Sequence, residues 1–449
     1  MLIYNTATRK KEELKTIKPG EVGMYACGPT VYSSQHIGNM YAYISWDILV
    51  RSLKYLGFKV KYVMNVTDVG HLTSDSDEGE DKMEKGSKRE GLSVWDIAKK
   101  YEKQFFDDEK LLNIERPDVV CRATEYIEEQ IELIKKIEQN GFTYKISDGI
   151  YFDTSKFGAY ADFAKLNLEQ LKEGARVETN PEKKNITDFA LWKFSPKNEK
   201  RQMEWESPWG VGFPGWHIEC TAMSTKHLGV PFDIHTGGID HISIHHTNEI
   251  AQSFGAFGRN SVNYWMHNGF LTFKSEKISK STGGLLTVGD LVAMGFEPLA
   301  YRYMVISSQY RSGLDFSLDN LKSAQISLRK LRELVKEAKG EINKEYIDQF
   351  KQLLENDLSM PEVMALVWKI ARDEPATVLE MDKVLGLNLG VIKEEIIPEE
   401  VKKLVLERKK AREEKNWGES DRLREEIRKL GYEVEDLQND CKIRKLMVI

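Results

Sequence analysis

The sequence predicts an α/β fold built on a parallel sheet, followed by a helical region and a small charged tail. Apolar residues alternate over 22–26, recur at helical spacing over 46–56, and alternate again over 58–66. This order of strand, helix and strand predicts a parallel pair joined by a crossover helix. Apolar residues between Leu321 and Val335 share one helix face, so helices are expected from residue 320 onward.

The loop between the first strand and its helix is the first place to expect a ligand. The strand that contains Val22, Met24 and Ala26 stops at Cys-Gly-Pro-Thr, and Gly57 lies where the C-cap of the helix belongs. In open α/β folds ligands bind at the carboxyl edge of the sheet, which is where this loop lies.

Further along, the pattern changes several times. Residues 75–90 hold 11 charged side chains in 16 positions, with Met83 as the single apolar residue, and we expect a solvated, mobile loop there. Residues 95–140 have a helical pattern, 142–215 read as an insertion, and 216–270 return to short strands and a helix. After Pro398 a charged, helix-rich tail begins.

Composition excludes several classes of protein. At 449 residues, with 41% hydrophobic and 30% charged residues, the chain is an ordinary globular one of about three domains. It has no apolar run near the ~20 residues of a membrane span, no apolar signal-peptide region, and only four cysteines, so we expect a cytoplasmic protein. The net charge of −6 gives no whole-chain argument for nucleic-acid binding, although residues 401–449 carry 14 basic and 11 acidic side chains.

Two short motifs could bind phosphate. His36 and Asn39 flank Gly38 at the expected helix start, where the helix N-terminus favours an anion. The alternative is a helix start with a capping Asn or a buried His. Lys277 and Lys280, in a Gly-rich loop, could follow the charge on a departing pyrophosphate, or could belong to a plain basic surface loop.

Four scattered residues offer metal-ligand chemistry. His245 and Glu249 share a helix face, and with Cys27 and Cys220 they form a set that Zn²⁺ accepts. The short spacing between cysteines that is usual in zinc sites is absent. Buried cysteines and an exposed helical pair are the alternative interpretation.

Taken together and in this order, the motifs resemble those of the cysteinyl-tRNA synthetases, a family of class I aminoacyl-tRNA synthetases, over nearly the whole chain. The resemblance rests on the following segments: Met-Tyr-Ala-Cys-Gly-Pro-Thr-Val-Tyr at 24–32, His-Ile-Gly-Asn at 36–39, Asn-Val-Thr-Asp at 65–68, Gly-Trp-His-Ile-Glu-Cys at 215–220, the run 233–249, Lys-Ile-Ser-Lys-Ser at 277–281 and Tyr-Arg-Ser at 310–312.

The resemblance implies a doubly wound parallel (Rossmann-type) catalytic sheet with an insertion, an all-α bundle and a small anticodon-binding domain. The expected divisions are these: 1–115, first half of the catalytic domain; 116–214, connective insertion; 215–268, second half; 269–319, stem-contact segment with the 277–281 loop; 320–397, helical bundle; 398–449, anticodon-binding domain. The reaction it implies activates L-cysteine with ATP and Mg²⁺ to cysteinyl-adenylate and transfers the cysteinyl group to the terminal adenosine of tRNA(Cys). A monomer is implied.

The resemblance also implies residue roles. His36, Asn39, Lys277 and Lys280 would act on the triphosphate, and Gly238 and Asp240 would meet the adenosine. Gly28, Thr67, Trp216 and His235 would form the rest of the amino-acid pocket. Cys27, Cys220, His245 and Glu249 would bind one Zn²⁺ that ligates the substrate thiolate and so rejects serine, which an apolar pocket could not reject strongly enough.

The sequence departs from the family pattern at four places. Asn39 stands where the family usually has a second His, residues 235–238 read His-Thr-Gly-Gly where His-Gly-Gly-Gly is frequent, and residues 244–249 read Ile-His-His-Thr-Asn-Glu where Pro-His-His-Glu-Asn-Glu is frequent. His245 rather than His246 is a ligand by alignment, not by spacing. Residues 437–442 read Leu-Gln-Asn-Asp-Cys-Lys where a Gly-Thr-x-Trp segment is common, so the anticodon-reading residues stay open. The rival interpretations are a ligase that transfers cysteine to a small amine such as an amino sugar, and a non-enzymatic tRNA-binding paralogue. The first would need no anticodon-reading tail, and the second would lack the lysines or the ligand set.

Overall fold

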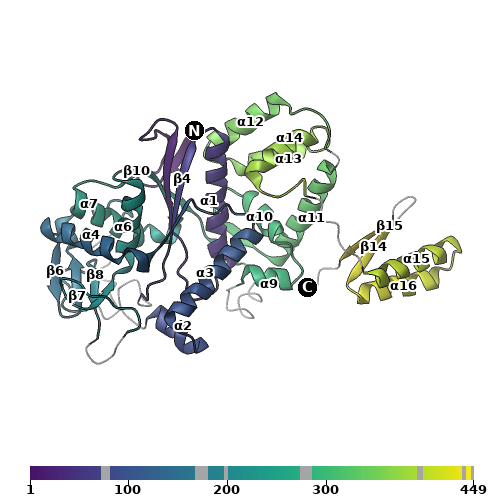
Figure 1. Ribbon diagram of the computed structural model, residues 1–449. Helices are drawn as coiled ribbons and strands as arrows, with labels where there is room; N and C mark the ends of the chain where they lie inside the picture. The colour runs from purple at the N-terminus through teal and green to yellow at the C-terminus, as the bar shows by residue number, and fades with distance from the viewer. Residues whose placement is uncertain are drawn as a thin grey trace.

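The computed structural model describes residues 1–71, 81–166, 180–196, 201–273, 286–336, 338–391, 398–436 and 441–445. Its centre is a five-stranded sheet in which every neighbouring pair is parallel, in the order β11-β10-β3-β4-β5 (Figure 1). The strands are β3 (Glu21–Ala26), β4 (Lys59–Val66), β5 (Val119–Arg122), β10 (Phe232–Gly238) and β11 (Val262–Asn268). The predicted α/β class is confirmed.

The crossover helix between β3 and β4 is α1 (Ile37–Tyr55), the long helix at the centre of Figure 1. It buries Trp46, Leu49 and Leu53, as the helical spacing predicts. It ends at Leu56, and Gly57 follows with a φ of +95°, a conformation that favours glycine. The strand–helix–strand unit is therefore confirmed.

Helix α1 packs on one face of the sheet. Helices α4, α6 and α7 cover the opposite face, to the left in Figure 1. Beyond them lies an antiparallel sheet in the order β6-β7-β8-β9, which comes from the region expected to be an insertion. The bounds are α4 (Ile127–Gln139), α6 (Trp216–Leu228), α7 (His245–Phe257), β6 (Thr143–Ile146), β7 (Gly149–Phe152), β8 (Phe189–Phe194) and β9 (Gly212–Pro214), with 3₁₀ turns η1 (Ala123–Tyr126), η2 (Thr154–Lys156) and η3 (Ile239–His241).

Two local expectations differ from the structure. The charged stretch 75–90 is not all loop: α2 (Lys82–Glu90) begins at the N-cap Asp81, and Met83 is fully buried. One apolar side chain packed against α3 (Val94–Leu111) is enough to hold this short helix against the domain. Strand β5 lies beyond residue 115, inside the stretch with a helical pattern, yet it pairs with β4 in the central sheet.

The second half of the described chain is mainly helical, and α11 buries the apolar face predicted for it. Its elements are α9 (Val288–Ala293), α10 (Pro298–Ile306), α11 (Leu318–Val335), α12 (Lys344–Glu355), α13 (Met360–Ile370) and α14 (Pro375–Leu385), with the parallel pair β12 (Leu271–Phe273) and β13 (Leu314–Phe316). At the N-terminus β1 (Leu2–Asn5) pairs with β2 (Lys10–Glu13). The bundle shares one continuous core with α1.

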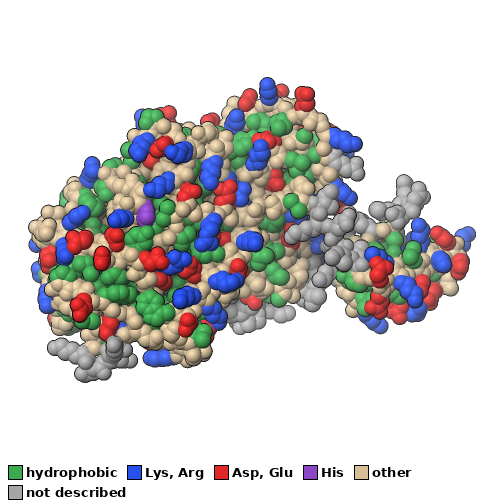
Figure 2. Space-filling view, viewed as in Figure 1, with side chains coloured by type: hydrophobic (Ala, Val, Ile, Leu, Met, Phe, Trp, Pro, Cys, Tyr) green, Lys and Arg blue, Asp and Glu red, His purple; other side chains and the backbone are tan. Residues whose placement is uncertain are grey.

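A small unit at the C-terminus stands apart on the right of Figure 1. It consists of α15 (Glu399–Glu413), α16 (Trp417–Lys429) and the antiparallel strands β14 (Tyr432–Asp436) and β15 (Cys441–Lys445). Val401, Val405 and Ile427 belong to its separate small core. Charged side chains of both signs cover the face visible in Figure 2.

Candidate active site

A cavity of about 490 Å³ opens at the carboxyl ends of β3, β4 and β10. This is the edge of the sheet at which the sequence predicts a ligand. Its wall brings together residues that are far apart in the chain. Four of the residues expected near ATP line it: His36, Asn39, Gly238 and Asp240. Three of the residues expected around the amino acid also line it: Gly28, Thr67 and Trp216.

The start of α1 faces this cavity. His36 is the N-cap, and its Nδ1 accepts a hydrogen bond from the backbone N–H of Asn39 at 3.2 Å. The Asn39 side-chain oxygen accepts one from the backbone N–H of His36, also at 3.2 Å. Burial lowers the pKa of His36, which favours the neutral form of the imidazole. The capping alternative is thus observed, and it leaves the other polar atoms of both side chains available to a ligand in the cavity.

Gly28 allows the ends of β3 and β4 to approach each other closely. A Cβ at this position would lie 1.7 Å from the carbonyl oxygen of Asn65, so no other residue fits without moving the backbone. The Gly28 backbone N–H donates a hydrogen bond to Asn65 Oδ1 at 2.8 Å. The loop that carries Cys27 is therefore held directly against the end of the neighbouring strand.

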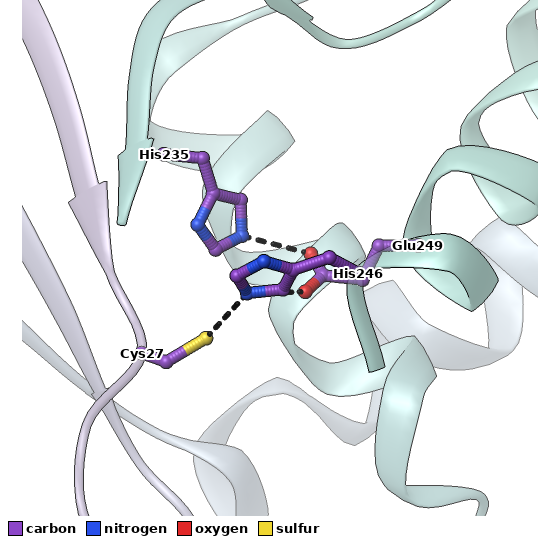
Figure 3. Close-up of side chains that lie close together, drawn as sticks. All are labelled: Cys27, His235, His246 and Glu249. Carbon is purple, nitrogen blue, oxygen red and sulfur yellow. Dashed lines mark hydrogen bonds and ion pairs between the residues drawn. The ribbon is translucent and has the colours of Figure 1, made fainter. Parts of the chain in front are cut away.

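One wall of the cavity is a buried cluster of cysteine, histidine and glutamate. The predicted set, Cys27, Cys220, His245 and Glu249, has its ligand atoms within 4.8 Å of one another. Cys27 follows β3, Cys220 lies on α6, and the other two lie one turn apart on α7. A second group meets the same criterion with Cys27, His235, His246 and Glu249, and Figure 3 shows these four side chains pointing toward one another.

Contacts within the cluster fix which atoms face its centre. Glu249 lies 3.2 Å from His245 Nε2 through one carboxylate oxygen and 3.0 Å from His235 Nε2 through the other. The oxygen near His245 is Oε1, which is buried and makes this ion-pair contact but no hydrogen bond among the described residues. Cys27 Sγ lies 3.4 Å from His246 Nε2. A buried carboxylate oxygen without a hydrogen bond, beside two thiols and imidazole nitrogens, is a donor set that fits a zinc ion.

His245 and His246 each contact another histidine through the ring nitrogen that faces away from the cluster. His245 Nδ1 lies 2.9 Å from His217 Nδ1, and His246 Nδ1 lies 2.7 Å from His267 Nε2. His267 in turn contacts Thr6 Oγ1 at 2.8 Å. Histidine ligands of metals usually have such outer partners on the second ring nitrogen. These contacts leave both Nε2 atoms facing the cluster.

The electrostatics of the cluster keep Glu249 ionised. Burial by itself would raise its pKa, but His235 and His245 lower the pKa to about 2. Burial by itself would likewise lower the pKa of His245, but Cys220 and Glu249 raise it to about 10. Burial raises the pKa of the Cys27 thiol. The carboxylate thus supplies a fixed negative charge to any cation that enters.

The positions of four further predicted residues, His235, Lys277, Lys280 and Asp240, are as follows. His235 is fully buried behind the cavity wall, where it contacts Glu249. Lys277 and Lys280 lie outside the described residues. Asp240 lies in η3, which follows the end of β10.

Sequence reasoning missed Lys82 as a cavity residue. Lys82 lines the cavity and lies over the ring of Trp216, with Nζ 5.0 Å from the ring centroid. It belongs to α2, the helix within the stretch we expected to be a solvated loop. The signal that could have found it is Met83, because a single apolar residue in such a charged run needs a place to be buried.

With this geometry established, comparison with known proteins identifies the family. Residues 13–326 match the family described as tRNA synthetases class I (C) catalytic domain, and residues 395–444 match the cysteinyl-tRNA ligase anticodon binding domain. The chain belongs to the cysteine–tRNA ligase family. It is 46% identical over 447 residues to cysteine–tRNA ligase 1 of Burkholderia lata, covering 97% of this chain and 95% of that one. It is 43% identical over 491 residues to cysteine–tRNA ligase of Treponema denticola, covering 99% of both.

Solved structures support the fold of this class I synthetase. Methionyl-tRNA synthetase of Mycobacterium tuberculosis, in complex with methionyl-adenylate, superimposes with a TM-score of 0.57 at 13% identity, over 82% of this chain and 88% of that one. The predicted doubly wound sheet with an insertion, a helical region and an anticodon-binding domain is confirmed. The chain is an enzyme with cysteine–tRNA ligase activity. Among its described helices, none is both long and apolar enough to cross a membrane.

Proposed function

We propose that this chain activates L-cysteine with ATP and Mg²⁺ to cysteinyl-adenylate and then transfers cysteine to the terminal adenosine of tRNA(Cys). One observation carries the proposal: the Cys/His/Glu cluster and the start of α1 line the same cavity. A thiol-recognising group and an anion-binding helix end are therefore within reach of one bound adenylate.

Zinc in this cluster would be held by Cys27, Cys220, His245 and Glu249. When bound, the ion supplies a Lewis-acidic position that prefers a thiolate sulfur to a hydroxyl. Serine is close to cysteine in shape, and an apolar pocket rejects a small hydroxyl weakly. Selection by sulfur ligation is our explanation of how the enzyme distinguishes the two.

The choice of His245 over His246 rests on access to the cavity. Cys27, Cys220 and His245 line the cavity, whereas His235, His246 and Glu249 do not. An ion held by the set with His245 would be open to a ligand in the cavity. The set with His246 would bury the ion behind the wall, so we assign His246 and His235 to holding Cys27 and Glu249 in place.

The phosphate end of the site would use the start of α1. His36 and Asn39 would donate to the triphosphate, and Lys277 and Lys280 would neutralise its charge as pyrophosphate leaves. Gly238 and Asp240 would contact the adenosine, and Gly28, Thr67 and Trp216 would enclose the amino acid. The caps on His36 and Asn39 support this role, because they hold both side chains at the cavity wall.

The C-terminal unit favours tRNA over a small amine as the acceptor. Residues 395–444 match an anticodon binding domain, for which a ligase acting on an amino sugar would have no use. We infer that the enzyme acts as a monomer, with each chain carrying its own site and its own tRNA contacts.

Cysteine-dependent exchange of pyrophosphate into ATP tests the proposal directly. The assay is run with and without a zinc chelator and with serine as competitor, and zinc content is measured in parallel. We expect exchange with cysteine, none with serine, and loss of exchange as zinc is removed. Exchange that persists in zinc-free protein would overturn the metal's role while leaving the adenylation chemistry intact.

A further inference from the structure

The hydrogen bonds around Thr67 determine where its hydroxyl proton points. Asn65 Oδ1 accepts from the Gly28 backbone N–H at 2.8 Å, so the amide nitrogen of Asn65 is the group facing Thr67. That nitrogen lies 3.1 Å from Thr67 Oγ1 and donates to it. Since the hydroxyl has one proton and two lone pairs, its proton goes to the remaining neighbour, Glu219 Oε2, at 2.9 Å.

Thr67 therefore offers the cavity a lone pair and no proton. Its side chain lines the cavity beside Cys27, Gly28 and Trp216. The hydroxyl oxygen accepts a hydrogen bond from Asn65 through one lone pair and donates its proton to Glu219. One lone pair is left to accept a hydrogen bond from a ligand. A group that donates a hydrogen bond fits this position, and a carboxylate, which only accepts, does not.

Glu219 adds a negative charge directly behind this hydroxyl. It lies on α6, fully shielded from solvent, and its second oxygen contacts His71 Nε2. Within the described ranges its polar contacts are the Thr67 hydroxyl and the His71 ring, and no described Lys or Arg pairs with it. A buried carboxylate favours a cationic group nearby. The donor that suits the cavity side of Thr67 is therefore a positively charged one.

We propose that Glu219, held by His71, is a positioning residue that acts through Thr67 to make this wall select the α-ammonium group of the amino acid. The inference rests on the proposed function, because it takes an amino acid as the ligand of the cavity. The substrate would then be recognised at a second point besides the metal. Two neighbouring residues of α6 would serve the two groups of one substrate, Cys220 the thiol and Glu219 the ammonium.

The test separates the ammonium group from the rest of the substrate. Three ligands are compared on zinc-loaded enzyme: cysteine, cysteamine, which keeps the amine and thiol, and 3-mercaptopropionate, which keeps the thiol and carboxylate. The KM for cysteine is measured by pyrophosphate exchange, and the other two are measured as competitors of cysteine. In Glu219→Gln, cysteine and cysteamine should weaken roughly five- to tenfold while 3-mercaptopropionate and ATP stay unchanged. Equal weakening of all three ligands, or of none, would overturn the proposal.

Asp68→Asn is the matched control. Asp68 is the residue next to Thr67 and is also a buried carboxylate, but it accepts its hydrogen bonds from Thr124, at 2.9 Å from the backbone and 2.6 Å from the hydroxyl. The ratio of cysteine to 3-mercaptopropionate affinity should stay at the wild-type value in this variant. A change in that ratio equal to that of Glu219→Gln would overturn the specific role of Glu219.

Thr67→Val tests whether Glu219 acts through the hydroxyl. We expect this variant to lose affinity for cysteine and cysteamine selectively, and the double variant with Glu219→Gln to lose no more than Thr67→Val alone. A further selective loss in the double variant would mean that Glu219 acts directly on the ligand, and would overturn the proposal that it acts through Thr67. If Glu219→Gln does not fold, as zinc content and melting temperature would reveal, an unchanged ligand ratio in Thr67→Val overturns the proposal by itself. Wild-type enzyme without cysteine-dependent exchange would instead refute the proposed function.

Discussion

The Arg302 guanidinium and the Asp47 carboxylate form an ion pair fully shielded from solvent, with Nη2 2.5 Å from Oδ2. Arg302 lies on α10 and Asp47 on α1, so the pair joins the segment after the catalytic sheet to the helix whose start faces the cavity. Next to it, the Tyr301 hydroxyl donates to the Ile37 carbonyl oxygen at 2.7 Å. Helix α10 thus contacts α1 at two points along its length, Ile37 and Asp47.

This pair predicts an asymmetric effect of mutation. Asp47→Asn removes the carboxylate hydrogen-bonded to the buried Arg302 and leaves backbone carbonyl oxygens as its hydrogen-bond partners, so it should lower stability by about 3 kcal/mol or more. Arg302→Met should cost less, because Arg51 still pairs with Asp47 at 2.8 Å. Melting temperatures of the two variants test the order. A larger loss in Arg302→Met would mean that packing, rather than charge, dominates here.

The proposed cysteine ligands, Cys27 and Cys220, predict that zinc and the discrimination against serine are lost together. Cys220→Ser should bind less zinc and lose its discrimination against serine in pyrophosphate exchange, because a neutral hydroxyl replaces a thiolate ligand. Cys121→Ser is the control, since Cys121 is equally buried but outside both ligand groups. Full zinc content in Cys220→Ser would refute its assignment as a ligand.

Lys280 lies outside the described residues, and its proposed role rests on the family motif. Lys280→Ala should slow adenylate formation by about 100-fold or more, because the lysine charge that would stabilise the leaving pyrophosphate is lost. The affinity for tRNA should barely change. Single-turnover adenylation and filter binding of tRNA separate the two effects, and equal damage to both would count against the triphosphate role.

The C-terminal unit predicts a separation of the two half-reactions. A chain that ends at residue 397 removes α15, α16 and their own small core, while the core around α1 stays complete. Pyrophosphate exchange should persist and charging of tRNA should weaken. Normal charging by the shortened chain would show that this unit does not bind tRNA.

Asp68 predicts a pH dependence of stability. Burial raises its pKa from 3.8 to about 6, even though Thr124 donates two hydrogen bonds to it. The folded chain then holds the proton more tightly than the unfolded chain, so the contribution of Asp68 to stability falls as pH rises through this interval. Asp68→Asn removes this pH-dependent contribution to stability. The melting temperature of the variant relative to that of the wild type should therefore increase between about pH 4 and pH 7. A difference that is flat with pH would contradict the raised pKa.

The sequence by itself determined the elements whose apolar spacing is regular. Alternation and helical periodicity predicted β3, α1, β4 and the buried face of α11, because these patterns are local and each is read within one element. The motifs also predicted His36, Cys27 and Cys220 as site residues, and all three line the cavity. Strand β5 and helix α2 were missed. Strand β5 is stabilised by pairing with β4, which is distant in sequence, and α2 has a single apolar residue, Met83, so its own pattern is weak.

The tertiary structure decided how the site is assembled. Spacing does not distinguish His245 from His246, because both lie on α7 and both carry a ring nitrogen toward the cluster. Only the packing of α7 against β10 and α6 puts one of them on the cavity wall and the other behind it. The link from Thr67 to Glu219 is of the same kind: it joins the end of β4 to a helix far along the chain, and such contacts arise only when the sheet brings the two together.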